Sequence, residues 1–152
     1  MKIRHILLTT DLSADSLRPC EPVADLARET GARITLLHVV PIVAVAPHGA
    51  PLAPAITPPD TSSHVEQARA VLEEQRTLLG EGVDVEVEVL AETSVPKTVA
   101  HYAAAHDVDL IALSTHGHTG FRHLVLGSVA ESILRHSEVP VLTFPQPKTP
   151  KK

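Results

Sequence analysis

The chain of 152 residues contains one cysteine, one tyrosine, two phenylalanines and no tryptophan. A single cysteine cannot form an internal disulfide, and this indicates a reducing compartment. So few aromatic side chains argue against a platform that stacks the bases of single-stranded nucleic acid. The formal net charge of −5 argues against a DNA-binding surface, which needs clustered Lys and Arg. We therefore expect no nucleic-acid partner.

Long apolar runs are also missing. The first apolar run, Ile6 to Leu8, is much shorter than the apolar region of a signal peptide. No other stretch approaches the ~20 apolar residues that a membrane-spanning helix needs. We expect a cytoplasmic protein that does not interact with membranes, and its length suits one domain.

Five short β-type segments alternate with four helical ones. The expected strands are 3–9, 33–39, 83–89, 109–114 and 139–144. Segment 83–89 alternates strictly between apolar and polar residues, which predicts an outer strand, whereas 109–114 is apolar as expected for a strand covered on both faces. Pro140 predicts that the last strand lies at an edge or begins at that residue.

Helix starts and stops are visible between these strands. Two capping-box patterns, Ser63 with Glu66 and Ser128 with Glu131, predict helix N-termini. The other signals are Pro22 as the start of the regular first helix, Gly31 as its end, and Ser94 before the first-turn Pro96.

The alternation predicts a single-domain α/β fold with a five-stranded parallel sheet and helices on both faces. Periodicity does not determine the strand order. In the order 3-2-1-4-5 that we expect, the first and fourth strands are neighbours where the winding reverses, and ligands bind beyond strand ends at such a point. Polar residues follow both strands, at 9–11 and at 114–118.

Two segments fall outside this pattern. Residues 41–62 contain six of the thirteen prolines and no periodicity, which predicts a flexible loop. Residues 146–152 are expected to form a disordered tail, so the domain is expected to span 1–145.

The most informative spacing links Gly117 to Gly127 and Ser128 across nine intervening residues. Gly117 permits a sharp turn and a close approach of backbone to ligand. Gly127 and Ser128 open a helix, whose free N–H groups attract anions. The alternative is that Gly117 is an ordinary turn glycine and Ser128 only a helix cap.

Four segments carry a resemblance to a known family: ILLTTDLS at 6–13, ITLLHVV at 34–40, DLIALSTHG at 109–117 and GSVAESILRHSEVPVL at 127–142. They resemble the universal stress protein (UspA-like) family along nearly the whole chain. The ATP-binding branch of that family has the pattern G-x-x-G, nine residues, G-[S/T]. Gly117, Gly127 and Ser128 match it, and Ser114 replaces the first glycine.

The resemblance implies a Rossmann-like fold of the HUP (adenine nucleotide alpha hydrolase-like) class. It also implies binding of ATP, or of ADP or AMP, with Mg²⁺, and a homodimer that pairs through the last strand, from Val139 to Phe144. Adenine would lie near Val39 and Leu113, ribose near Asp11 and the phosphates over the glycine motif. The site residues implied are Thr9, Thr10, Asp11, Val39, Leu113, Ser114, Thr115, His116, Gly117, His118, Gly127, Ser128 and Val129.

Several residues have alternative interpretations. Asp11 also suits an Asx-turn, and His38 a satisfied core or strand-end position. Cys20 is expected to be a packing residue. His116, His118 and His123 form a cluster without a nearby Cys or carboxylate, so we expect no metal site.

Alternative functions also remain. One is a dimeric interaction module of the same family without nucleotide binding. Another is a nucleotidyl- or phosphotransferase, suggested by the T-x-G-H pattern at 115–118. With neither a positioned base nor a Walker-type lysine, we expect at most a weak ATPase that acts as a regulator responsive to stress or energy state.

Overall fold

The computed structural model describes residues 2–43, 61–115 and 127–145. They form one five-stranded parallel sheet with the order β3-β2-β1-β4-β5. The predicted fold class and strand order are therefore confirmed. The strands are β1 (His5–Thr9), β2 (Arg33–Pro41), β3 (Val85–Glu92), β4 (Leu110–Ser114) and β5 (Val141–Phe144).

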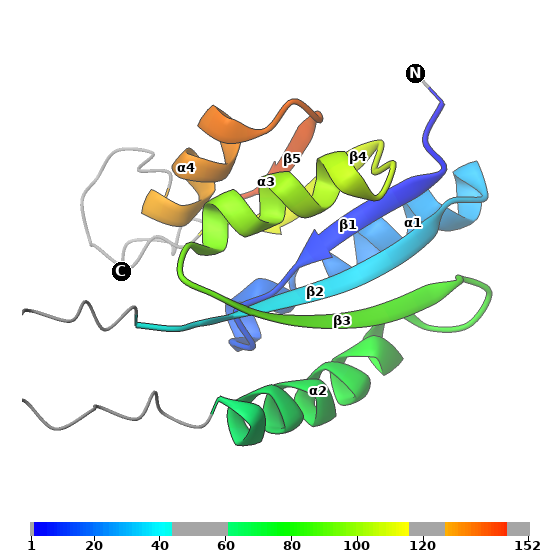
Figure 1. Ribbon diagram of the computed structural model, residues 1–152. Helices are drawn as coiled ribbons and strands as arrows, with labels where there is room; N and C mark the ends of the chain where they lie inside the picture. Colours follow the sequence, from blue (N-terminus) through cyan, green and yellow to red (C-terminus); the bar gives the residue numbers. More distant parts are fainter. Residues whose placement is uncertain (1, 44–60, 116–126, 146–152) are drawn as a thin grey trace, which may run out of the picture.

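The helices cover both faces of the sheet (Figure 1). Helices α1 (Cys20–Thr30) and α2 (Ser62–Arg76) pack on one face, where their apolar residues form one core cluster. Helices α3 (Val95–Ala105) and α4 (Ser128–His136) form the second cluster on the other face. Two short 3₁₀ helices complete the described chain, η1 (Ala14–Leu17) after β1 and η2 (Thr77–Leu79) after α2.

Burial follows the sequence pattern of the strands. Every residue of β4 is buried, because helices cover it on both faces. The strictly alternating strand β3 lies at one edge of the sheet and β5 lies at the other, as predicted. Of the expected proline-rich loop, residues 44–60 lie outside the described part, while Pro41 ends β2 and Ser62 begins α2. The expected tail at 146–152 also lies outside it.

Helices begin close to both predicted starts, but the side-chain caps predicted there are wrong. Helix α2 begins at Ser62, after Thr61, and no side chain caps it. Helix α4 begins at Ser128, after Gly127, and likewise has no side-chain cap. Glu131 pairs with Arg135 one turn later instead, at 2.8 Å. Glycine has no side chain, so the first-turn N–H groups of α4 donate to no side chain of their N-cap residue.

The ends of helices α1 and α3 agree better with those predicted from the sequence. Helix α1 begins at Cys20, two residues before the predicted start, because Pro22 fits in a first turn, whose N–H groups have no helical partner. Gly31 ends it in the left-handed conformation, at φ 69°, as expected. Helix α3 follows Ser94 and carries Pro96 in its first turn.

Candidate functional site

A cavity of about 600 Å³ lies where β1, β2 and β4 end, against α3 and α4. Its apolar wall comes from the second core cluster, through residues such as Leu37, Val99 and Ile133. Its polar groups come from the end of β1 and the turn after it, from His38 of β2, from Ser114 of β4 and from the start of α4. The lining residues are Thr9, Thr10, Asp11, Ser16, Leu37, His38, Val39, Pro41, Val95, Val99, Leu113, Ser114, Gly127, Ser128, Val129, Ala130 and Ile133.

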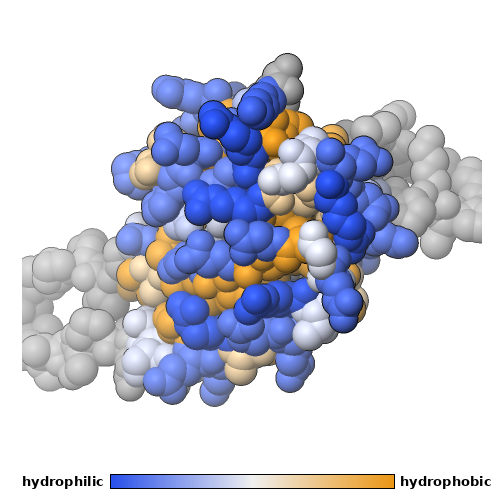
Figure 2. All heavy atoms as spheres, turned by 90° about the vertical axis from the view of Figure 1, so that its right-hand side faces the viewer, coloured by the Kyte–Doolittle hydropathy of each residue, from blue (hydrophilic) through white to orange (hydrophobic). Residues whose placement is uncertain are grey.

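The opposite end of the sheet is different. Figure 2 faces the end at which the strands begin, and hydrophilic residues cover most of that surface. A smaller hollow there, of about 430 Å³, is lined mainly by charged residues of both signs, among them Arg33, Arg76 and Glu86. The apolar walls that a flat organic ligand needs are therefore found at the carboxyl ends of the strands.

Nine of the residues expected at the site line this single cavity: Thr9, Thr10, Asp11, Val39, Leu113, Ser114, Gly127, Ser128 and Val129. Thr115 does not line it, and its backbone N–H donates to the Phe144 carbonyl at 3.1 Å. His116, Gly117 and His118 lie outside the described residues. The fold thus brings together segments that are more than one hundred residues apart in the chain.

The turn after β1 presents Asp11 at the cavity. Leu12 adopts a left-handed conformation, at φ 69°, and its N–H donates to the Thr10 hydroxyl at 3.0 Å. The Asp11 carboxylate accepts hydrogen bonds from the backbone N–H and the hydroxyl of Ser13. This is the Asx-turn that the sequence allowed, and it orients the carboxylate that lines the cavity.

A buried amide from α2 supports this turn. Gln75 is 6% exposed, and its Nε2 donates to the Leu12 carbonyl at 3.3 Å. Its Oε1 accepts from the Thr10 hydroxyl at 3.1 Å, and that hydroxyl also contacts Ser16 Oγ at 2.7 Å. The sequence analysis missed Gln75 and Ser16. Gln75 could have been noticed as the one polar residue in the buried stripe that it shares with Ala68, Leu72 and Leu79.

His38, in the second half of β2, lines the same cavity. Its Nδ1 lies 2.9 Å from the Thr10 carbonyl, which can only accept, so Nδ1 carries the proton. In the neutral ring Nε2 is then the acceptor. His38 is the satisfied strand-end histidine that was predicted, and it is also a lining residue that was not.

Gly127 and Ser128 bring the start of α4 to the cavity. Gly127 has φ −56° and ψ 148°, which any residue can adopt, so glycine is not required there by backbone conformation. Its advantage is the missing Cβ, which leaves room for another molecule close to the backbone. The helix start offers N–H groups and the positive end of the helix dipole.

The chain matches a known family over almost all of its length. The model of the universal stress protein family matches residues 2–145. The chain belongs to the universal stress protein family. A universal stress protein of Methanocaldococcus jannaschii is 28% identical over 149 residues, which cover 95% of this chain and 84% of the relative.

Solved structures of the family have the same fold. A universal stress protein in complex with cAMP has a TM-score of 0.70 at 18% identity, covering 95% of this chain and 98% of that one. The universal stress protein of Archaeoglobus fulgidus in complex with dAMP has a TM-score of 0.67 at 19% identity, covering 94% and 98%. At these identities the likeness establishes the Rossmann-like fold, in agreement with the predicted class.

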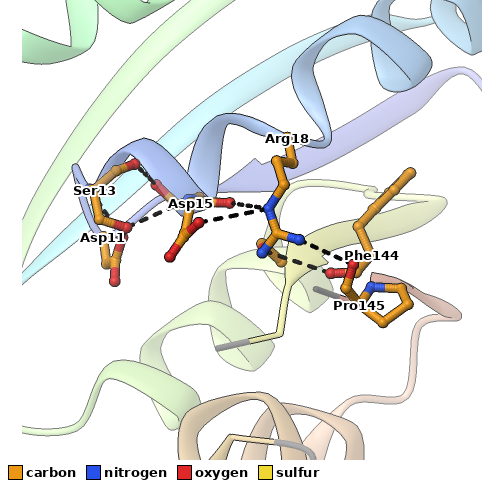
Figure 3. A network of polar contacts seen from close by, with 8 residues as sticks. Asp11, Ser13, Asp15, Arg18, Phe144 and Pro145 are labelled. Atoms are coloured by element: carbon orange, nitrogen blue, oxygen red, sulfur yellow. Dashed lines mark hydrogen bonds and ion pairs between the residues drawn. The ribbon is translucent and has the colours of Figure 1, made fainter. Parts of the chain in front are cut away.

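One feature sets this universal stress protein apart from the glycine pattern of the ATP-binding branch. Ser114 stands where that pattern has its first glycine, and its hydroxyl receives a hydrogen bond from Arg18 Nη2 at 3.2 Å. Figure 3 shows Arg18 between the turn after β1 and the end of β5. The sequence analysis missed Arg18, because the two residues are 96 positions apart and no local pattern links them.

The other candidate groups for chemistry are the Cys20 thiol and possible metal ligands. Burial raises the pKa of the Cys20 thiol to about 11, so it stays protonated and packs in the core, as predicted. Within the three described segments, no three His, Cys, Asp or Glu side chains gather to hold a metal ion. The cluster of His116, His118 and His123 lies outside those segments. None of the described helices is long and apolar enough to cross a membrane.

Proposed function

We propose that this universal stress protein binds an adenine nucleotide in the cavity at the ends of β1, β2 and β4. The ligand would be ATP, or ADP or AMP. The observation that carries the proposal is the composition of this one cavity, which joins an apolar slot, a carboxylate and a helix start whose N-cap residue is a glycine. These three groups match the three parts of a nucleotide.

Each part of the nucleotide has a counterpart in the lining. Adenine would lie between aliphatic side chains near Val39 and Leu113, both of which are at most 4% exposed. Ribose would lie at Asp11, because an ionised carboxylate accepts hydrogen bonds from hydroxyl groups. The phosphates would lie over Gly127 and Ser128, where N–H groups and the helix dipole favour anions.

The oxygen ligands that the cavity offers are too few to hold Mg²⁺ by themselves, so the ion would bind together with the phosphates of the nucleotide. Asp11 is the one carboxylate among the described lining residues. Because that carboxylate is assigned to the ribose, Mg²⁺ would arrive with the nucleotide and be held by its phosphates and by waters. The ion would neutralise phosphate charge in the bound complex.

We propose a regulatory role, responsive to stress or energy state in the cytoplasm, with hydrolysis that is slow at most. Efficient phosphoryl transfer needs a positioned base or water-orienting group and cationic side chains at the transferring phosphate. No lysine or arginine occurs among the described residues that line the cavity.

We propose further that two chains pair through their last strands to form a homodimer. The carbonyls of Pro140 and Phe144 face β4, where they accept from Ile111 and Thr115. Backbone groups alternate along a strand, so the N–H groups of Val141 and Thr143 point to the open edge. Leu142 is 38% exposed on the same strand, and an edge of this kind needs to be covered.

Thr143→Pro tests the dimer. The substitution removes an N–H that points to the open edge and leaves the ladder with β4 in place. Light scattering should give a dimer mass for the wild type and a monomer mass for the variant at tens of micromolar. A wild-type monomer, or a variant that stays dimeric, would reject this interface.

Nucleotide binding is tested by identifying what the purified protein carries and what it takes up. Because the chain has no tryptophan and one tyrosine, a bound adenine dominates its absorbance in the near ultraviolet. Mass spectrometry of the material released on denaturation should identify an adenine nucleotide. Titration calorimetry with ATP, ADP and AMP should give micromolar affinity, equivalent to roughly 8 kcal/mol.

Ser114 also favours a second candidate, a dimeric interaction module without nucleotide binding. A serine in place of the first motif glycine places a side chain at the cavity, and Arg18 holds it there. A dimer that releases no nucleotide and gives no heat with any of the three ligands up to millimolar concentration would establish this alternative. It would also rule out the first proposal.

A further inference from the structure

Arg18 joins three parts of the fold beside the cavity. It follows η1, and its side chain is 26% exposed. Its Nε donates to the Asp15 carbonyl at 3.2 Å and its Nη1 to the Pro145 carbonyl at 3.0 Å. Its Nη2 donates to Ser114 Oγ at 3.2 Å, and the Asp15 carboxylate lies 3.8 Å from Nε. Figure 3 shows this network running from the turn after β1 to the end of β5.

The direction of the hydrogen bond between Arg18 and Ser114 is determined by chemistry. A guanidinium has only donors, so the Ser114 oxygen must accept, and its own proton remains available for another acceptor. The nearest acceptor given by the described residues is the Phe144 carbonyl at 3.5 Å, which is long for a hydroxyl donor. That carbonyl already accepts the Thr115 N–H at 3.1 Å.

The Ser114 oxygen therefore accepts a hydrogen bond from a charged group, while the Ser114 proton makes only a long hydrogen bond. Ser114 is 8% exposed and lines the cavity together with Gly127 and Ser128. A hydroxyl that accepts from a cation is polarised and becomes a better donor in a low-dielectric site. Such a donor suits an anionic oxygen.

We propose that Arg18 is a positioning residue that presents the Ser114 hydroxyl as a hydrogen-bond donor to the phosphate of the bound nucleotide. This inference rests on the proposed function and deepens it. Ser114 and the start of α4 then form one phosphate subsite, in which serine is a functional replacement for the first motif glycine. A glycine at this position would leave Arg18 Nη2 without its acceptor.

The inference is tested with ligands that differ only in phosphate. Adenosine, AMP and ATP are titrated calorimetrically into the wild type, Arg18→Met, Ser114→Ala and the double variant. Arg18→Met should weaken AMP and ATP roughly tenfold, the loss expected for a hydrogen bond to a charged group, while adenosine affinity stays within about twofold. Ser114→Ala should give the same pattern. In the Ser114→Ala background, Arg18→Met should change AMP affinity by less than about twofold.

Arg28→Met is the matched control. Arg28 makes the same kind of tether at the far end of α1, where it donates to the carbonyls of Leu79 at 2.8 Å and Glu81 at 3.2 Å. It also pairs with Asp25 at 2.7 Å. This variant should lose stability as Arg18→Met does, without any change in nucleotide affinity. If Arg18→Met does not fold, Ser114→Ala still tests the donor, because it leaves the tether to Pro145 intact.

The outcomes separate the inference from the proposed function. An equal loss for adenosine and AMP in Arg18→Met would overturn the inference, because it would indicate a packing role. So would an undiminished effect of Arg18→Met in the Ser114→Ala background, or normal AMP binding by Ser114→Ala. A wild type that binds none of the three ligands would overturn the proposed function and this inference with it.

Discussion

Gln75→Met should destabilise the domain by loosening the turn that carries Asp11. Methionine keeps the length of the side chain and its apolar contacts but removes the amide. The Leu12 carbonyl then loses its partner from Gln75 Nε2, whereas the Thr10 hydroxyl keeps its contacts with Ser16 and with the Leu12 N–H. The main loss is therefore one partly buried carbonyl without a hydrogen bond.

An unsatisfied buried polar group costs about 1–3 kcal/mol, and Leu12 is partly exposed, so we expect about 1.5 kcal/mol. For a domain of this size that corresponds to a fall in Tm of about 3–6 °C. The assay is urea and thermal unfolding followed by circular dichroism, because the chain has no tryptophan for fluorescence. Glu74→Met, at the neighbouring exposed position of α2, is the control.

A Gln75→Met variant as stable as the wild type within about 0.5 kcal/mol would refute this reasoning, because measurement error and surface substitutions account for differences of that size. A double-mutant cycle with Thr10→Val should give a coupling energy of at least about 0.5 kcal/mol, since the two side chains are 3.1 Å apart. Additive losses would mean that the hydrogen bond between them contributes nothing.

Three further predictions concern pH, the cavity and catalysis. Burial lowers the pKa of His5, so folding favours its neutral form, and stability should fall as the pH drops from about 6.5 towards that lowered pKa and then level off. His5→Gln should lack this step in urea midpoints measured across the range, and an unchanged profile would contradict the assignment. Gly127→Val should weaken AMP binding roughly tenfold with little change in Tm, because a branched side chain blocks close approach to the helix start; a fall in Tm as large as that of a core mutation would indicate a packing role. ATP turnover should stay below about 1 s⁻¹, and a faster phosphate-release rate would require an enzyme with a catalytic group not yet identified.

Exposed ion pairs add little to these effects. The pairs of Arg76 with Glu73 and of Arg135 with Glu131 are about half exposed or more on both sides. Exposed pairs of this kind contribute about 0–1 kcal/mol and are screened by salt. The polar contacts that matter for the site are those around Thr10 and Ser114, whose side chains are 8% exposed and are less screened by water.

From the sequence alone, the outer and the buried strand of the sheet could be predicted, as could a site where the first and fourth strands end, whereas periodicity left the strand order open. Strict alternation in the third strand and continuous apolarity in the fourth predicted an edge and a buried centre, because a side chain's face follows directly from its position in a strand. Gly31 and Pro96 marked helix limits through their own backbone preferences. Polar strand ends at Asp11 and Ser114 predicted one cavity, because parallel strands end at the same side of a sheet.

Only the tertiary structure shows which polar side chains hydrogen-bond to one another beside that cavity. Arg18 and Ser114 are 96 residues apart, and Thr10 and Gln75 are 65 apart, so neither pair leaves a periodic signal in the chain. The two capping boxes marked their helix starts only to within two residues, since α2 begins at Ser62 and α4 at Ser128 and neither has a side-chain cap. Local preferences act over a few residues, whereas burial and hydrogen bonding between distant segments depend on which surfaces the folded chain brings together.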